Sequence, residues 1–147
     1  MLRGNKGEWS EVYVLLRLLA DGKIFAADSD LNKLEDIFFP IIKVIREEVA
    51  GEVKEYLPGN NVSIYFNGEK IKEVSAEILN NEAKELLAVI INRESTGAFS
   101  IEKTERFMDE IFCYRLTAPA SDKSDITMEL MDIHTGYRPI VGFSIKS

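Results

Sequence analysis

Two segments near the end of the chain alternate apolar and polar residues, and this alternation is the strongest constraint on the fold. They cover residues 126–133 and 140–146 and are separated by His134-Thr135-Gly136-Tyr137-Arg138-Pro139. A period of two predicts β-strands that each bury one face, and the glycine and proline between them predict a turn. The sequence therefore predicts an antiparallel hairpin in this part of the chain.

The register of this hairpin is predicted by its own pattern. A slip of one residue would mix apolar and polar side chains on both faces, so one register is favoured. The pairs on its apolar face are Ile126 with Ile145, Met128 with Phe143, and Leu130 with Val141. The pairs on its other face are Asp125 with Lys146, Thr127 with Ser144, and Glu129 with Gly142. The polar face therefore gathers an acid, a serine and a lysine.

This trio resembles the catalytic motif of the PD-(D/E)xK nucleases, with Asp125 as the acid, Lys146 as the lysine and Ser144 in the usual place of a second acid. A carboxylate can hold Mg²⁺ against a scissile phosphate, and the metal lowers the pKa of a water. A lysine nearby can orient that water and offset the developing charge. The structural alternative is a cross-strand salt bridge on a half-exposed sheet, worth less than about 1 kcal/mol.

A second acid is needed because Ser144 leaves the motif one carboxylate short. Glu129 lies on the same predicted face and is one candidate. Asp132 has the parity of the apolar face and lies close to the turn, so we interpret it as a turn residue. His134, the only histidine, lies in the same turn. We interpret it as solvated, since this chemistry requires no histidine.

The rest of the chain mixes helical and strand patterns, which predicts an α/β fold. Apolar residues at helical spacing predict helices over 8–20, 76–92 and 101–112, with Ser75 and Ser100 as N-caps. Asn67-Gly68 is the strongest hairpin signal in the chain. The other predicted elements are strands over 23–27, 41–45, 62–66 and 70–74, a helical turn over 31–37, Pro40 leading into the second strand, and a loop over 57–61.

The composition is that of a globular domain. The chain has 147 residues, of which 46% are hydrophobic and 29% charged. Its single cysteine, Cys113, excludes an internal disulfide and a zinc motif, and we expect Cys113 and Trp9 in the core. No apolar run approaches the roughly 18 residues of a membrane span. We therefore expect a cytoplasmic protein without a membrane partner.

The net charge is acidic, with 18 Lys and Arg against 25 Asp and Glu, or −7. This balance counts against nonspecific nucleic-acid binding, which depends on basic residues that neutralise phosphates. Metal-dependent nucleases are an exception, because their sites concentrate carboxylates that a divalent cation neutralises.

Five segments, in order along nearly the whole chain, match one known family. They are Gly4-Asn5-Lys6-Gly7-Glu8-Trp9-Ser10-Glu11, Ala26-Ala27-Asp28-Ser29-Asp30-Leu31-Asn32, Phe39-Pro40-Ile41-Ile42-Lys43-Val44-Ile45-Arg46-Glu47, Ile133-His134-Thr135-Gly136 and Gly142-Phe143-Ser144-Ile145-Lys146-Ser147. With these segments the chain resembles the HpaII family of type II restriction endonucleases. The match is far more specific than the nuclease motif alone.

The resemblance implies a restriction-endonuclease-like mixed sheet flanked by helices and Mg²⁺-dependent cleavage of double-stranded DNA at CCGG. A DNA methyltransferase would protect the host. Asp125 would be the metal ligand, Lys146 would lie beside the attacking water, and Ser144 would occupy the acidic position. Related nucleases carry a metal-facing glutamate on the first helix, which Glu11 fits, with Glu8 as the second choice. The structural alternative for both glutamates is compensation of the helix dipole.

Family members continue beyond the Ser-x-Lys strand. The resemblance therefore implies that residues 1–147 form one domain, the N-terminal portion of a catalytic domain, with an incomplete catalytic sheet. The base-reading residues would lie beyond Ser147. A homodimer is compatible with this interpretation, although the sequence does not give the oligomeric state. The alternative is a non-catalytic remnant or interaction module of the same fold.

Overall fold

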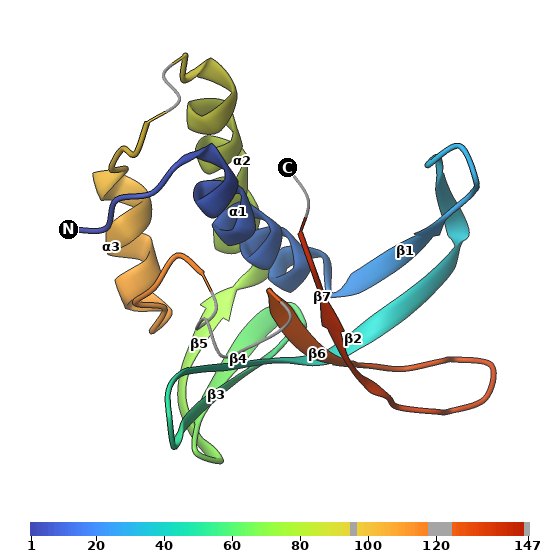
Figure 1. Ribbon diagram of the computed structural model, residues 1–147. Coiled ribbons are helices and arrows are strands. Elements are labelled where there is room, and N and C mark those ends of the chain that lie inside the picture. Colours follow the sequence, from blue (N-terminus) through green and yellow to red (C-terminus); the bar gives the residue numbers. More distant parts are fainter. Residues whose placement is uncertain (95–96, 118–124, 146–147) are drawn as a thin grey trace.

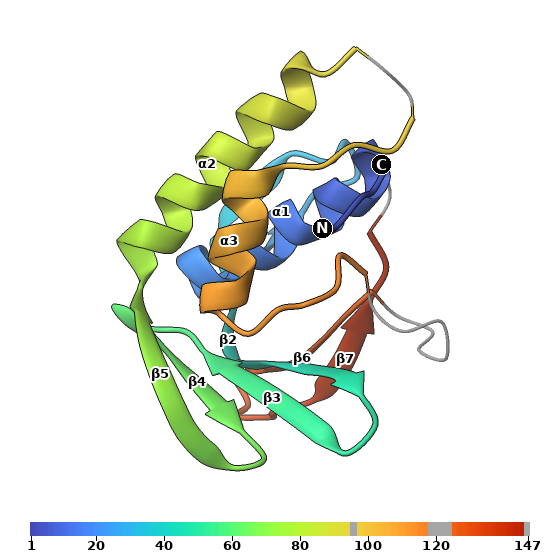
Figure 2. The same cartoon turned by 90° about the vertical axis from the view of Figure 1, so that its left-hand side faces the viewer.

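A computed structural model describes residues 1–94, 97–117 and 125–145 of the chain (Figure 1). The elements in chain order are α1 (Lys6–Asp21), β1 (Lys23–Ala27), β2 (Lys33–Val49), β3 (Glu52–Leu57), β4 (Asn61–Phe66), β5 (Glu69–Ser75), α2 (Ala76–Asn92), α3 (Glu102–Glu110), β6 (Ile126–Leu130) and β7 (Ile140–Phe143). The three helices lie together on one side of a sheet (Figure 2). The predicted α/β fold with flanking helices is confirmed.

The sheet has the strand order β5-β4-β3-β2-β6-β7, and β1 also pairs with β2. Every pairing among the described strands is antiparallel. This part of the sheet therefore lacks the mixture of parallel and antiparallel strands that the resemblance implies. Short connections account for five of the six pairings, because hairpins join antiparallel neighbours, whereas a parallel pair needs a long crossover. The sixth pairing, of β2 with β6, joins strands that are far apart in the sequence.

β2 is the longest strand, and its partners change at Pro40. The Pro40 carbonyl accepts the Met131 N–H at 3.0 Å, whereas the next N–H, that of Ile41, donates to the Gly22 carbonyl at 2.9 Å. The C=O and N–H of one trans peptide point in opposite directions, so β1 and β6 flank opposite edges of β2. Two predictions are wrong here: Pro40 lies within the strand, and residues 33–37 belong to β2 instead of forming a helical turn, with Lys33 and Leu34 paired with β1.

The helices bury their apolar faces against the inner face of the sheet. α1 begins at a capping box, in which the Asn5 side chain accepts the Glu8 N–H and the Glu8 side chain accepts the Asn5 N–H. Trp9 is fully buried, and its Nε1–H donates to the Phe99 carbonyl at 3.0 Å. Cys113 is also fully buried, so both core predictions are confirmed. Among the described residues, we find no helix with the length and apolarity of a membrane span.

The structure confirms two predictions that depend only on neighbouring residues, a helix cap and a hairpin turn. α2 has the predicted bounds, and Ser75 caps it by accepting the Glu77 N–H. The Asn67-Gly68 turn joins β4 to β5 with φ values of 47° and 87°. The Ser100 prediction is wrong: α3 begins at Glu102 after Ile101, which makes no side-chain cap bond. Strand β3 follows Gly51, a turn that the sequence prediction missed.

The terminal hairpin forms, but its register is shifted by two residues. The observed pairs are Ile126 with Phe143, Thr127 with Gly142, Met128 with Val141, and Glu129 with Ile140. A shift of two keeps every side chain on its predicted face, so the alternation cannot distinguish the two registers. The turn decides between them, since Asp132 accepts the His134 N–H with its side chain and the Gly136 N–H with its carbonyl. Asp132 as a turn residue and His134 as an exposed one are both confirmed.

Candidate functional site

Two acids predicted for the metal site, Glu11 and Asp125, meet between α1 and the start of β6. Glu11 is half-buried in α1, and its Oε2 atom is buried without a hydrogen-bond partner among the described residues. The Asp125 N–H donates to the Phe143 carbonyl at 2.8 Å, and Asp125 Oδ2 accepts the Ile145 N–H at 2.6 Å. The last two strands therefore fix the Asp125 carboxylate beside the helix.

The surroundings of Glu11 disfavour its negative charge. Burial raises the pKa of the Glu11 carboxyl above its ordinary value, and the charges of Asp125 and Glu8 raise it further. A hydrogen bond with the Asp125 side chain acts in the same direction, whereas the Arg46 charge lowers the pKa. A cation beside the Glu11 carboxylate would favour its charged form.

The remaining residues of the predicted motif are placed only in part. Ser144 is exposed and directly precedes Ile145, whose N–H holds Asp125. Lys146 lies outside the described residues, so its predicted pairing with Asp125 stays a prediction. The expected Thr127–Ser144 pair does not form, because Thr127 lies opposite Gly142.

The two alternative second acids, Glu8 and Glu129, each have a partner of their own. Glu8 closes the capping box of α1, with its Oε1 at 3.1 Å from the Asn5 nitrogen. Glu129 pairs with Arg138 at 2.9 Å and with Lys43 at 4.0 Å. It lies on the outer face of the sheet, since the neighbouring residues of β6 are the buried ones.

A buried charged network, missed by the sequence analysis, lies next to this site. The Arg46 Nε–H donates to Glu48 Oε2 at 2.7 Å, and its Nη2 donates to the Arg115 carbonyl at 2.6 Å. Glu48 also forms an ion pair with Lys54 at 3.6 Å and accepts the Tyr114 N–H at 3.0 Å. A signal was present in the sequence: Arg46 and Glu48 share the parity of the buried Val44 in β2.

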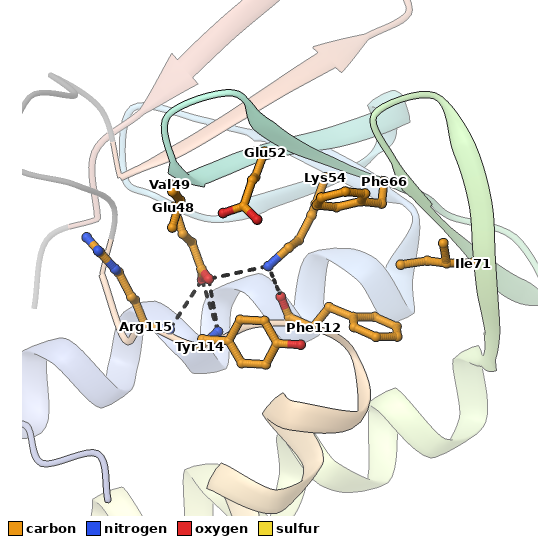
Figure 3. A pocket seen from close by; sticks show the side chains of 9 residues that line it. All are labelled: Glu48, Val49, Glu52, Lys54, Phe66, Ile71, Phe112, Tyr114 and Arg115. Carbon is orange, nitrogen blue, oxygen red and sulfur yellow. Dashed lines mark hydrogen bonds and ion pairs between the residues drawn. The ribbon is translucent and has the colours of Figure 1, made fainter.

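The network forms one wall of a pocket of about 400 Å³ (Figure 3). On this wall Glu48 and Lys54 point toward each other, and Lys54 Nζ donates to the Phe112 carbonyl at 2.6 Å. The opposite wall comes from Phe66 and Ile71 of the β4–β5 hairpin. Because the buried charges are paired with one another and with backbone groups, we interpret this wall as structural.

No three Cys, His, Asp or Glu side chains within the described ranges form a group that could hold a metal ion. Two acids that the structure does bring together are Glu11 and Asp125. Mg²⁺ fits such a donor set, because in proteins it is bound through one or two carboxylates and keeps several waters. The buried, unpaired Oε2 of Glu11 is the atom that such an ion would satisfy.

Comparison with known proteins identifies the family. The sequence model of the HpaII restriction endonuclease family matches residues 5–147. The chain belongs to the HpaII restriction endonuclease family. Over 146 residues it is 41% identical to the type II restriction enzyme HpaII of Haemophilus parainfluenzae. This match covers 98% of the chain and 40% of the relative, so the chain spans about two fifths of that enzyme's length. No solved structure matches the chain.

Proposed function

We propose that this HpaII-family chain carries the metal-binding acids of a type II restriction endonuclease that cleaves double-stranded DNA at CCGG with Mg²⁺. The observation that carries the proposal is the Glu11–Asp125 pair, with its buried and unpaired carboxylate oxygen. Family membership and the relative's name support the nuclease class. The CCGG site comes from the resemblance noted in the sequence.

In this proposal Glu11 and Asp125 hold the cation from two directions. α1 presents Glu11, and the Ile145 N–H holds Asp125 Oδ2 at 2.6 Å. When bound, Mg²⁺ supplies positive charge beside the scissile phosphate and lowers the pKa of a water. Arg46 offsets part of the acidic charge before the cation arrives.

The sequence assigns two further roles in the same mechanism. Lys146 orients the attacking water and stabilises the charge of the transition state. Ser144 takes the place of the usual second acid, which leaves Glu11 to supply the second carboxylate. A cytoplasmic location, a protecting DNA methyltransferase and a homodimer complete the proposal for the whole enzyme.

Direct cation binding tests the acid pair without requiring activity. We expect isothermal titration calorimetry with Mn²⁺ to show one binding site in the chain. Glu11→Gln and Asp125→Asn should each weaken binding at least tenfold, because each removes one charged ligand. Glu129→Gln is the matched control, because its carboxylate pairs with Arg138 on the outer face of the sheet. Unchanged Mn²⁺ affinity in Glu11→Gln would contradict the proposed site.

A cleavage assay separates the endonuclease from the alternative, a non-catalytic module of the same fold. The assay uses plasmids with unmethylated or methylated CCGG, Mg²⁺, and this chain alone or supplemented with the remaining part of the Haemophilus enzyme. Cutting restricted to unmethylated DNA supports the proposal. Mn²⁺ binding without cutting in either mixture supports the module.

A further inference from the structure

The pocket beside the charged network has the size and the lining of a ligand site. Its volume of about 400 Å³ lies within the range of about 300–1,000 Å³ that is usual for small-molecule sites. Phe66, Phe112 and Tyr114 supply aromatic walls, and Ile71 extends the apolar surface (Figure 3). Ligand sites combine such walls with a few polar groups that orient the ligand.

Phe112 lines this pocket in a backbone conformation that a bulky residue rarely adopts. It follows Ile111, the C-cap of α3, and its φ is 63°. Glycine is the usual residue at such a position, because a Cβ atom is disfavoured at positive φ. Lys54 Nζ donates to the Phe112 carbonyl at 2.6 Å and helps to hold this conformation. Residues held in strained conformations cluster at functional sites, so the ring at this position indicates a role in binding.

Two charged side chains of the pocket are not used by the network. Glu48 and Lys54 are paired with each other, whereas the side chains of Glu52 and Arg115 have no hydrogen bond or ion pair within the described ranges. In the view of Figure 3, the Glu52 side chain points into the pocket and the Arg115 guanidinium points outward from its rim. The pocket therefore offers aromatic faces, one free acceptor and one free cation at its rim.

We propose that this pocket binds one unstacked nucleotide of the DNA substrate, with an amino-bearing base such as cytosine inside and its phosphate at Arg115. Aromatic side chains stack on bases, a carboxylate accepts a hydrogen bond from the amino group of cytosine, and a guanidinium binds phosphate. Glu52 favours cytosine over thymine, because thymine carries a carbonyl oxygen in place of the amino group. The inference rests on the proposed function, which supplies DNA as the substrate, and adds a base contact within the described residues.

The pocket lies at the same end of the sheet as the candidate metal site. Arg46 connects the two, because its Nη2 donates to the Arg115 carbonyl at 2.6 Å and its charge lowers the pKa of Glu11. β2, which carries Arg46, also pairs with β6, and β6 begins directly after Asp125. A DNA strand with one nucleotide in the pocket therefore passes close to the acid pair.

Nucleotide binding in EDTA tests the pocket without the metal site. We expect isothermal titration calorimetry to show that dCMP binds at least about fivefold more tightly than dTMP. It should also bind more tightly than deoxycytidine, which lacks the phosphate, and Arg115→Ala should abolish this difference. A single-stranded oligonucleotide containing CCGG should displace dCMP, which identifies DNA as the source of the nucleotide. Because no divalent cation is present, failure here is distinct from failure of the proposed function.

Substitutions in the lining test each contact. Glu52→Ala should remove the preference for dCMP over dTMP, whereas Glu35→Ala, at an exposed acid that does not line the pocket, should keep it. Tyr114→Leu should weaken dCMP binding at least about fivefold through lost stacking, whereas Tyr114→Phe keeps the ring and the affinity. Phe112→Gly relieves the positive φ, so it should fold, and the loss of its ring should also weaken binding.

Three results would overturn the proposal. The first is the absence of dCMP binding by the wild-type chain. The second is binding that Glu52→Ala and Tyr114→Leu leave unchanged, which would place the nucleotide elsewhere. The third is bound dCMP that the oligonucleotide does not displace, which would make a free nucleotide the ligand.

Discussion

Replacing Glu48 by glutamine should destabilise the protein far more than a typical surface substitution. Glu48 is 5% exposed, pairs with Arg46 and Lys54, and accepts backbone N–H groups of Tyr114 and Arg115. Removing one member of a buried ion pair costs about 3–5 kcal/mol, because the remaining charge stays buried without its partner. Breaking an ion pair on the surface costs less than about 1 kcal/mol.

The contacts that remain place Glu48→Gln at the lower end of this range. Arg46 keeps the Arg115 carbonyl and Lys54 keeps the Phe112 carbonyl, so each cation retains one acceptor. We therefore expect a loss of about 3 kcal/mol in the free energy of unfolding. For a chain of this size the loss lowers the melting temperature by about 6–12 °C.

Urea and thermal unfolding followed by circular dichroism measure this loss. The control is Glu55→Gln, which breaks the more exposed Lys43–Glu55 pair on the outer face of the sheet and should cost less than about 1 kcal/mol. Equal losses in the two variants would refute the reasoning. The double variant Arg46→Met/Glu48→Gln should lose less free energy of unfolding than the two single variants together, because the two side chains share one interaction.

Three further predictions use the same unfolding assays. Because the folded protein raises the pKa of Glu11 above its ordinary value of 4.5, the carboxyl stabilises the fold below pH 4.5 and this contribution is lost as pH rises. Glu11→Gln in EDTA should therefore gain stability relative to the wild type between pH 4 and 7; a constant difference would contradict this. Asn5→Ala breaks the capping box of α1 and should cost about 1 kcal/mol. Gly68→Ala forces a side chain into a φ of 87° and should cost about 1–2 kcal/mol, whereas Gly97→Ala, at an open position, should not.

The sequence predicted the elements whose signals are local. Ser75 as the cap of α2 and the Asn67-Gly68 turn depend on neighbouring residues alone, so propensity and pattern sufficed. The register of the terminal hairpin depends on the Asp132 turn, and a period of two is blind to a shift of two residues. Residues 33–37 belong to a strand in which Lys33 and Leu34 pair with β1, and no local pattern reveals that partner.

The candidate site was predicted to a different extent for each residue. The resemblance brought Glu11 together with Asp125, although their spacing in the sequence gives no sign of contact; the structure places the two side chains together. Their roles remain predictions. The network of Arg46 and Glu48 was missed because charges in a strand are usually assigned to its solvent face. Their burial depends on Lys54 and on the backbone near residue 114, which only the folded chain brings close.

The change of partners at Pro40 divides β2 into two regions of unequal protection. The first half pairs with β1 in a projecting hairpin, whereas the second half pairs with β6 over residues 41–45 and with β3 over residues 44–49. Stability is distributed in cooperative units that follow such contacts. We therefore expect the β1–β2 hairpin to open and reclose as its own cooperative unit while the central sheet stays intact. In that case one continuous strand joins a labile unit to a more protected one.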